Sequence, residues 1–146
     1  MVTCDTSFLC SLYLVDVHTP TARARLRKIK RPDALILSPF HEYELPNAIR
    51  LSVFRHLRDV TSGNAILAAF EADLAGGQFA RPTCNLADVL LEAKRLSSIY
   101  TLAGGHRAFD ILHVAAALQL GAKEFLTFDQ NQRKLAAEAG LKIGPI

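Results

Sequence analysis

The sequence predicts an α/β fold with a central, mainly parallel β-sheet flanked by α-helices. Short apolar runs alternate along the chain with longer segments of helical periodicity, which is the pattern of strand–helix–strand units. Runs such as Ala34-Leu35-Ile36-Leu37 are continuous in apolar residues, as expected for strands buried on both faces. Half of the 146 residues are hydrophobic and 21% are charged, enough apolar surface for one folded domain. We expect residues 1–146 to form that single domain.

The predicted strands are short, and turn residues or helix starts bound them. We expect strands at residues 2–4, 34–37, 124–128 and 141–143, with a further candidate at 78–81. Apolar spacing and capping residues predict helices at residues 7–15, 20–31, 39–57, 62–74, 86–102, 107–120 and 130–139.

The expected helix ends rest on particular residues. Thr19 followed by Pro20 is typical of a helix start. Thr61-Ser62 and Asn85 are expected to cap the helices that follow them. Pro46 lies inside the segment 39–57, where it should bend the helix or divide it.

The composition argues against several kinds of protein. Three cysteines without CxxC spacing do not predict a zinc site. Their odd number, in a chain without a secretory leader, suggests a reducing, cytoplasmic environment. No apolar run approaches the ~20 residues of a membrane span, so no membrane partner is expected. The net charge of +3 does not by itself identify a nucleic-acid partner.

Four acidic residues lie near predicted strand ends or helix starts. Asp5 and Asp129 directly follow strands, Glu44 lies six residues beyond Ser38, and Asp110 lies near the start of the helix 107–120. Ligand sites of open α/β sheets lie outside the carboxyl ends of the strands, so these side chains can converge. Converging carboxylates repel one another unless a cation neutralises them. Mg²⁺ or Mn²⁺ suits such ligands and keeps several waters, one of which can attack a phosphodiester.

Each acid taken alone also has a structural explanation. Asp5 and Asp129 are placed to cap the helices that follow them, and Glu44 can be a solvated helix residue. For a single acid the structural role is the commoner one. The set of four, all on one side of the sheet, favours a site.

Several neighbours of the acids can support them. Thr6, Ser7 and Thr127 carry hydroxyls that can orient a carboxylate or bond a metal-bound water, although capping and turn bonding are equally open. Arg107, three residues before Asp110, can offset carboxylate charge or meet a phosphate. His113 is more typical of a buried core histidine with its ring satisfied than of a general base.

Four segments, in order along the chain, resemble those of PIN domains. Residues 1–9 are similar to the family's opening, in which an acid precedes two hydroxyl residues. Residues 38–50 resemble the second acidic segment, where the spacing from Ser38 selects Glu44 rather than Glu42. Residues 109–118 and 125–129 resemble the third and fourth segments. The ordered set covers nearly the whole chain and is more specific than any one segment.

The resemblance implies a metal-dependent ribonuclease, most similar in size and build to the VapC toxins of bacterial VapBC toxin–antitoxin pairs. Members of that group cleave RNA with Mg²⁺ or Mn²⁺, form homodimers and are inhibited by an antitoxin whose tail covers the site. On this basis the catalytic and metal-binding residues are expected to be Asp5, Glu44, Asp110 and Asp129. Pro46 departs from the smooth helix usual in the family and is placed to shift Glu44.

The helix 20–31 carries a run of basic residues. Four of them are expected to share one face: Arg23, Arg27, Lys30 and Arg31. This face can attract an RNA backbone or an acidic antitoxin segment, or it can simply be solvated.

Two function classes follow from these observations. The first is an endoribonuclease that acts as the toxin of a type II pair, and the alternative is a non-catalytic PIN scaffold that binds RNA or protein. An aspartyl-phosphate phosphatase is disfavoured because Asp5-Thr6-Ser7 lacks a second acid two residues after the first.

Overall fold

The computed structural model describes residues 1–29 and 35–145. Within these ranges the chain contains a four-stranded sheet, formed by β1 (Val2–Cys4), β2 (Leu35–Ile36), β3 (Glu124–Leu126) and β4 (Lys142–Gly144). All neighbouring strands pair in parallel, in the order β2-β1-β3-β4. The predicted α/β class with a parallel sheet is confirmed.

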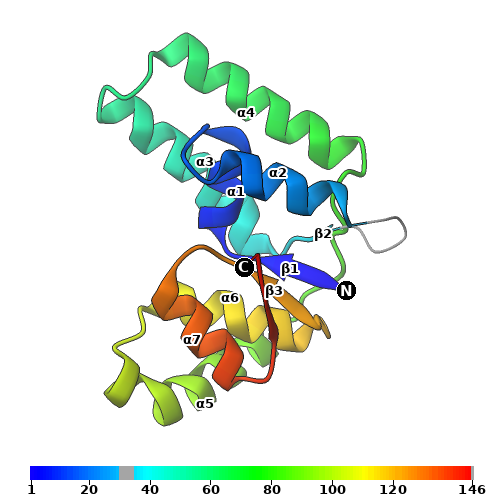
Figure 1. Ribbon diagram of the computed structural model, residues 1–146, viewed down its shortest axis with the longest axis vertical. Coiled ribbons are helices and arrows are strands. Elements are labelled where there is room, and N and C mark those ends of the chain that lie inside the picture. The colour runs from blue at the N-terminus through cyan, green and yellow to red at the C-terminus, as the bar shows by residue number, and fades with distance from the viewer. Residues whose placement is uncertain (30–34, 146) are drawn as a thin grey trace.

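The described residues form seven helices. They are α1 (Thr6–Tyr13), α2 (Thr19–Arg27), α3 (Pro39–Phe54), α4 (Val60–Ala75), α5 (Leu86–Gly104), α6 (Ala108–Gln119) and α7 (Gln130–Glu138). Figure 1 shows α1 to α4 on one side of the sheet and α5 to α7 on the other. No helix in the described ranges combines the length and apolar character needed to cross a membrane.

The sheet is buried on both faces, which explains its continuous apolar runs. Successive strand residues point to opposite faces. Phe125 packs into a cluster with Val114 and other residues of α5, α6 and α7. Its neighbour Leu126 packs into a second cluster with Phe8 and Phe70, on the side of α1 to α4.

The strand order places a switch point between β1 and β3. The chain leaves β1 to form β2 on one side, and returns to pair β3 on the other side of β1. Connections therefore diverge at the carboxyl ends of β1 and β3, where open α/β sheets bind their ligands. Asp5 directly follows β1, and Thr127 directly follows β3.

Pro46 does not divide its helix. α3 continues through it from Pro39 to Phe54, and the proline is buried. The proline lacks only the N–H that would bond the carbonyl of Glu42, four residues earlier. Packing of the flanking turns, which include the buried Leu45 and Ile49, outweighs that loss.

Some predicted boundaries are wrong because a different residue caps the helix. α4 begins earlier than predicted, because the Asp59 carboxylate accepts the Ser62 N–H at 2.7 Å and leaves Thr61-Ser62 inside the helix. His18, not Thr19, precedes the first residue of α2.

The candidate strand at 78–81 is reduced to one bridge between Ile36 and Ala80.

Candidate active site

The four predicted acids line one small cavity of about 100 Å³ at the carboxyl end of the sheet. The complete lining is Asp5, Thr6, Ser7, Glu44, Arg107, Asp110, His113, Asp129 and Gln132. The structure thus brings together residues that lie up to 124 positions apart in the sequence, 129 − 5 = 124.

Asp5 is held by hydrogen bonds on both carboxylate oxygens. Its Oδ1 accepts the Phe8 N–H at 2.8 Å and caps α1, while its Oδ2 accepts the hydroxyls of Ser7 at 2.6 Å and Thr127 at 2.7 Å. Only 3% of the residue is exposed. Burial raises the pKa of Asp5 above its ordinary value, although these three hydrogen bonds act in the opposite direction.

Glu44 lies one turn into α3 and faces the same cavity. Its Oε2 accepts hydrogen bonds from the Thr6 hydroxyl and from His113 Nε2, both at 2.6 Å. Partial burial raises the pKa of Glu44, but the hydrogen bonds from His113 and Thr6 outweigh it and hold the pKa below its ordinary value. Glu44 is therefore ionised at neutral pH, and its Oε1 has no hydrogen-bond partner among residues 1–29 and 35–145.

Arg107 links the other two acids. Its Nε donates to Asp110 Oδ2 at 2.8 Å, and its Nη2 lies 3.7 Å from Asp129 Oδ2. Asp129 also caps α7 by accepting the Gln132 N–H at 2.8 Å. The Arg107 side chain is 75% exposed, so it places a solvent-accessible positive charge beside these two acids. This is the charge-offsetting arrangement that its position in the sequence suggested.

His113 has a larger part in the site than predicted. It is buried, as expected for a core histidine, but its Nε2 bonds Glu44 and its Nδ1 has no partner within the described residues. The sequence signal was its position three residues after Asp110 on one helix, since such residues are neighbours on the helix surface. Gln132 also lines the cavity and donates from Nε2 to the Asp110 carbonyl at 3.2 Å; no sequence pattern singled it out.

The donor chemistry of the cavity fits a hard divalent cation. Carboxylate oxygens are the preferred ligands of Mg²⁺ and Mn²⁺, and four carboxylates face one arginine. Nevertheless, in the part of the chain that the structure describes, no three His, Cys, Asp or Glu side chains are close enough to hold one ion. Asp110 and Asp129 are instead turned to Arg107.

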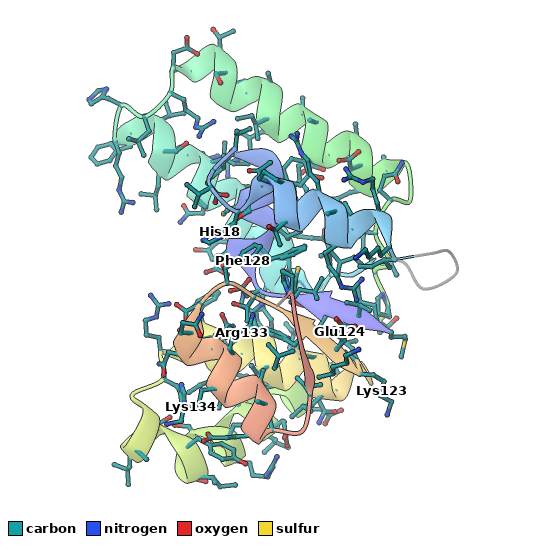
Figure 2. The ribbon with its side chains drawn as sticks, viewed as in Figure 1. His18, Lys123, Glu124, Phe128, Arg133 and Lys134 are labelled. Atoms are coloured by element: carbon teal, nitrogen blue, oxygen red, sulfur yellow. The ribbon has the colours of Figure 1, made fainter. Side chains whose placement is uncertain are left out.

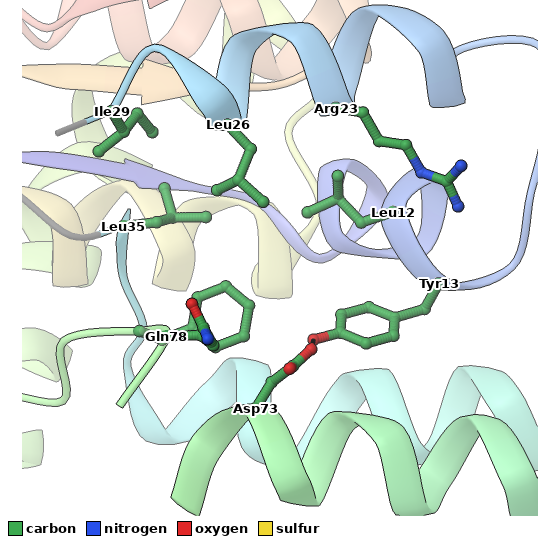
Figure 3. A pocket seen from close by; sticks show the side chains of 9 residues that line it. Leu12, Tyr13, Arg23, Leu26, Ile29, Leu35, Asp73 and Gln78 are labelled. Atoms are coloured by element: carbon green, nitrogen blue, oxygen red, sulfur yellow. Dashed lines mark hydrogen bonds between the residues drawn. The ribbon is translucent and has the colours of Figure 1, made fainter. Parts of the chain in front are cut away.

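A larger cavity of about 370 Å³ lies between α1, α2, α4 and β2 (Figure 3). Its one acid, Asp73, accepts the Tyr13 hydroxyl at 2.5 Å. Burial, together with this hydrogen bond, raises the pKa of Tyr13. Because that carboxylate is already engaged and stands alone, this cavity lacks the ligand set of a cation site.

The predicted basic face is described only in part. Arg23 and Arg27 are exposed on α2, and Arg23 also lines the larger cavity (Figure 3). Arg25 is paired with Glu124 at 2.7 Å. Lys30 and Arg31, the other two members of the predicted face, lie outside the described residues.

The chain belongs to the PIN domain family, because residues 2–138 match the PIN domain. The predicted resemblance is therefore confirmed. Among curated proteins, no sequence matches the chain.

Solved structures share this fold. FitAcB from Neisseria gonorrhoeae is 19% identical with a TM-score of 0.72, over 99% of this chain and 97% of that one. VapBC2 from Rickettsia felis, bound to a DNA fragment from its promoter, is 14% identical with a TM-score of 0.71, over 99% and 98%. VapC20 from Mycobacterium tuberculosis, a toxin that cleaves the sarcin–ricin loop, is 20% identical with a TM-score of 0.68, over 99% and 100%. At these identities the likeness is one of fold.

Proposed function

We propose that this PIN domain is a divalent-metal-dependent endoribonuclease and the toxin of a type II toxin–antitoxin pair. The observation that carries the proposal is the convergence of Asp5, Glu44, Asp110 and Asp129 on one cavity. The fold that surrounds this cavity is shared with a toxin that cleaves the sarcin–ricin loop. Four carboxylates in one place repel one another unless cations offset their charge.

The carboxylate oxygens of the cavity differ in how firmly hydrogen bonds hold them. Asp5 is anchored by Ser7, Thr127 and the α1 backbone, so its carboxyl group is fixed in position. Glu44 Oε1 and Asp129 Oδ2 have no short hydrogen bond in the described residues, which leaves them available as ligands for Mg²⁺ or Mn²⁺. When bound, such an ion supplies Lewis-acid chemistry, lowering the pKa of water and stabilising charge on a phosphate.

Arg107 suits contact with the RNA backbone. Its exposed guanidinium touches Asp110 and approaches Asp129, and arginine binds phosphate by the same paired N–H groups that bind carboxylate. We expect it to exchange a carboxylate for a phosphate when RNA enters.

The proposed partners are an antitoxin and a second copy of the chain. The similarity to VapBC2 supports an antitoxin, for which Arg23 and Arg27 offer exposed positive charge. A homodimer is supported by exposed apolar residues of α5, including Leu90 and Leu91, beside a groove between α5 and α6. The cysteines of the chain are unpaired, which suits a reducing, cytoplasmic compartment.

The direct test is RNA cleavage by the purified protein. We expect cleavage of total RNA in the presence of Mn²⁺, its loss on addition of EDTA, and its loss in Asp5→Asn. Asp88→Asn, the same change at an exposed acid outside the cavity, is the matched control and should cut normally. Cleavage that persists in Asp5→Asn would rule out the assigned site.

The alternative is a PIN scaffold that binds RNA or protein without chemistry. One observation favours this alternative. Asp110 and Asp129 contact Arg107, and no three acidic, histidine or cysteine side chains in the described residues are close enough to hold one ion. A pure binder would hold RNA with the same affinity in EDTA and in Mn²⁺, and would leave the RNA intact.

A further inference from the structure

Three aromatic rings form a stack that includes residues of the segments carrying Asp5 and Asp129. The rings of Phe8 and Phe128 lie 5.7 Å apart and within 18° of parallel. The imidazole of His18 lies 4.2 Å from Phe128 and within 11° of parallel. Phe8 is fully buried, Phe128 is half-buried and His18 is exposed, so the stack runs from the core to the surface. Figure 2 shows His18 beside Phe128.

The stack is joined directly to the candidate active site. Phe128 stands between Thr127, whose hydroxyl bonds Asp5, and Asp129, which lines the cavity. Phe8 donates its backbone N–H to Asp5 Oδ1. Two of the three rings therefore belong to segments that hold the acids, and the third, His18, stacks on Phe128 and is exposed.

The backbone that carries His18 is held in place. The His18 N–H donates to Asp16 Oδ1 at 2.8 Å, and Asp16 Oδ2 accepts the Ser11 hydroxyl at 2.8 Å. The next residue, Thr19, donates its hydroxyl to the Ser11 carbonyl at 2.6 Å. In contrast, the imidazole nitrogens have no hydrogen-bond partner within the described residues. A ring that is already ordered loses little entropy when a ligand stacks on it.

We propose that His18 is a stacking platform for a nucleobase of the RNA whose phosphodiester lies at the acidic cavity. This inference rests on the proposed ribonuclease function. Single-stranded bases are recognised by stacking on aromatic side chains, histidine included. Such stacking tolerates any base because every base has a π-face. The platform would hold the nucleotide next to the cut without restricting the sequence there.

The test measures RNA binding by variants at His18 in a cleavage-blocked Asp5→Asn background, at one salt concentration. The probe is a random-sequence pool of short single-stranded RNA. His18→Asn should weaken binding by about fivefold to 150-fold, as expected for the loss of one stacked base. His18→Phe keeps a ring and removes the ring nitrogens, so it should bind as tightly as His18. His56→Asn, the same change at another exposed histidine, is the matched control and should have no effect.

A second readout follows the base itself. An RNA that carries 2-aminopurine should lose fluorescence on binding to the His18 protein, and keep it with His18→Asn, because stacking quenches this base. Equal affinity for His18 and His18→Asn would overturn the platform while leaving the ribonuclease proposal intact. An equal loss of RNA affinity in His18→Phe and His18→Asn would also overturn the platform, since a hydrogen bond or charge of the imidazole would then explain the binding. If the unsubstituted protein binds no RNA, the platform and the proposed function fail together.

Discussion

At the residue scale, two acids act as helix caps and line the cavity at the same time. In the sequence, capping and ligand binding were alternatives for Asp5 and Asp129. In the structure they are compatible because a carboxylate has two oxygens: Asp129 Oδ1 accepts the Gln132 N–H while Oδ2 faces Arg107. Helices that begin at a strand end therefore bring capping acids to the ligand-binding edge of the sheet.

His113 is expected to position Glu44. His113→Leu removes the N–H that donates to Glu44 Oε2 at 2.6 Å and should lower Mn²⁺ affinity by about 10- to 100-fold, the usual effect of losing a partner of a metal ligand. His113→Gln keeps an N–H donor and should recover part of that affinity. Calorimetric titration with Mn²⁺ measures both. Equal affinities for His113→Leu and the unsubstituted protein would show that Glu44 needs no such partner.

His41 should make the fold sensitive to acid. Burial lowers the pKa of His41 to about 3, with the nearby His113 acting in the same direction. In the unfolded chain its pKa is about 6.5, so only the unfolded state takes up a proton between these values. The neutral ring accepts the Ser38 N–H and bonds the Cys4 carbonyl. Its stabilising contribution is complete above pH 6.5 and is lost as pH falls towards 3.

Urea denaturation between pH 7.5 and pH 4 measures this effect. The free energy of unfolding should fall with a slope of up to about 1.4 kcal/mol per pH unit from this one residue. His41→Gln should be less stable at neutral pH and show a shallower pH dependence. His56→Asn, at an exposed histidine, is the control and should keep the pH dependence of the native protein. If the free energy of unfolding fell with pH equally steeply in the native protein and in His41→Gln, His41 would not be the source of the acid sensitivity.

At the scale of elements, periodicity predicted which segments are helices, and capping decided where they begin. α5 starts after Asn85, as predicted, because the amide accepts the N–H groups of Ala87 and Asp88. α4 starts after Asp59 instead of at Thr61-Ser62. Both positions carry capping residue types, and the sequence alone does not rank two such candidates two residues apart.

The contact between α3 and α4 depends on a glycine. A Cβ on Gly63 would lie 2.6 Å from Val53 Cγ2, so the two helices approach more closely than any side chain allows. Gly63→Ala gains about 1 kcal/mol of helix propensity, but overpacking costs about 1–3 kcal/mol. We therefore expect net destabilisation, measured by thermal or urea unfolding. Val53→Ala combined with Gly63→Ala should recover part of the loss; a stabilised Gly63→Ala protein would refute the close contact.

At the scale of the whole molecule, the cavity brings together negative and positive side chains from segments that lie far apart in the sequence. Arg107 is the counter-ion of Asp110 and Asp129 in the absence of a metal. A divalent ion that binds the folded state alone stabilises it by mass action, by about 2.7 kcal/mol at a concentration of 100 times Kd. The stability of the fold should therefore report on occupation of the site.

Arg107→Gln should increase the stabilisation that Mn²⁺ gives to the folded protein. Without metal the variant should melt at a lower temperature, because its carboxylates lose their compensating charge, and Mn²⁺ should raise its melting temperature by more than that of the native protein. Arg95→Gln breaks an i,i+3 ion pair with Glu92 on α5, outside the cavity, and should leave the Mn²⁺ effect unchanged. An identical Mn²⁺ response in Arg107→Gln and the native protein would show that Arg107 does not compete for the site.

The sequence by itself determined the class of fold and the acids of the candidate site. Buried strands, helical periodicity and residues at strand ends are local properties, and parallel strands bring their carboxyl ends to one edge whatever their order. Only the tertiary structure decided which other side chains meet these acids. His113 reaches Glu44 from a different helix, and His18 reaches Phe128 from a loop more than a hundred residues earlier. Such contacts depend on how helices pack across the switch point, and no spacing in the chain encodes that packing.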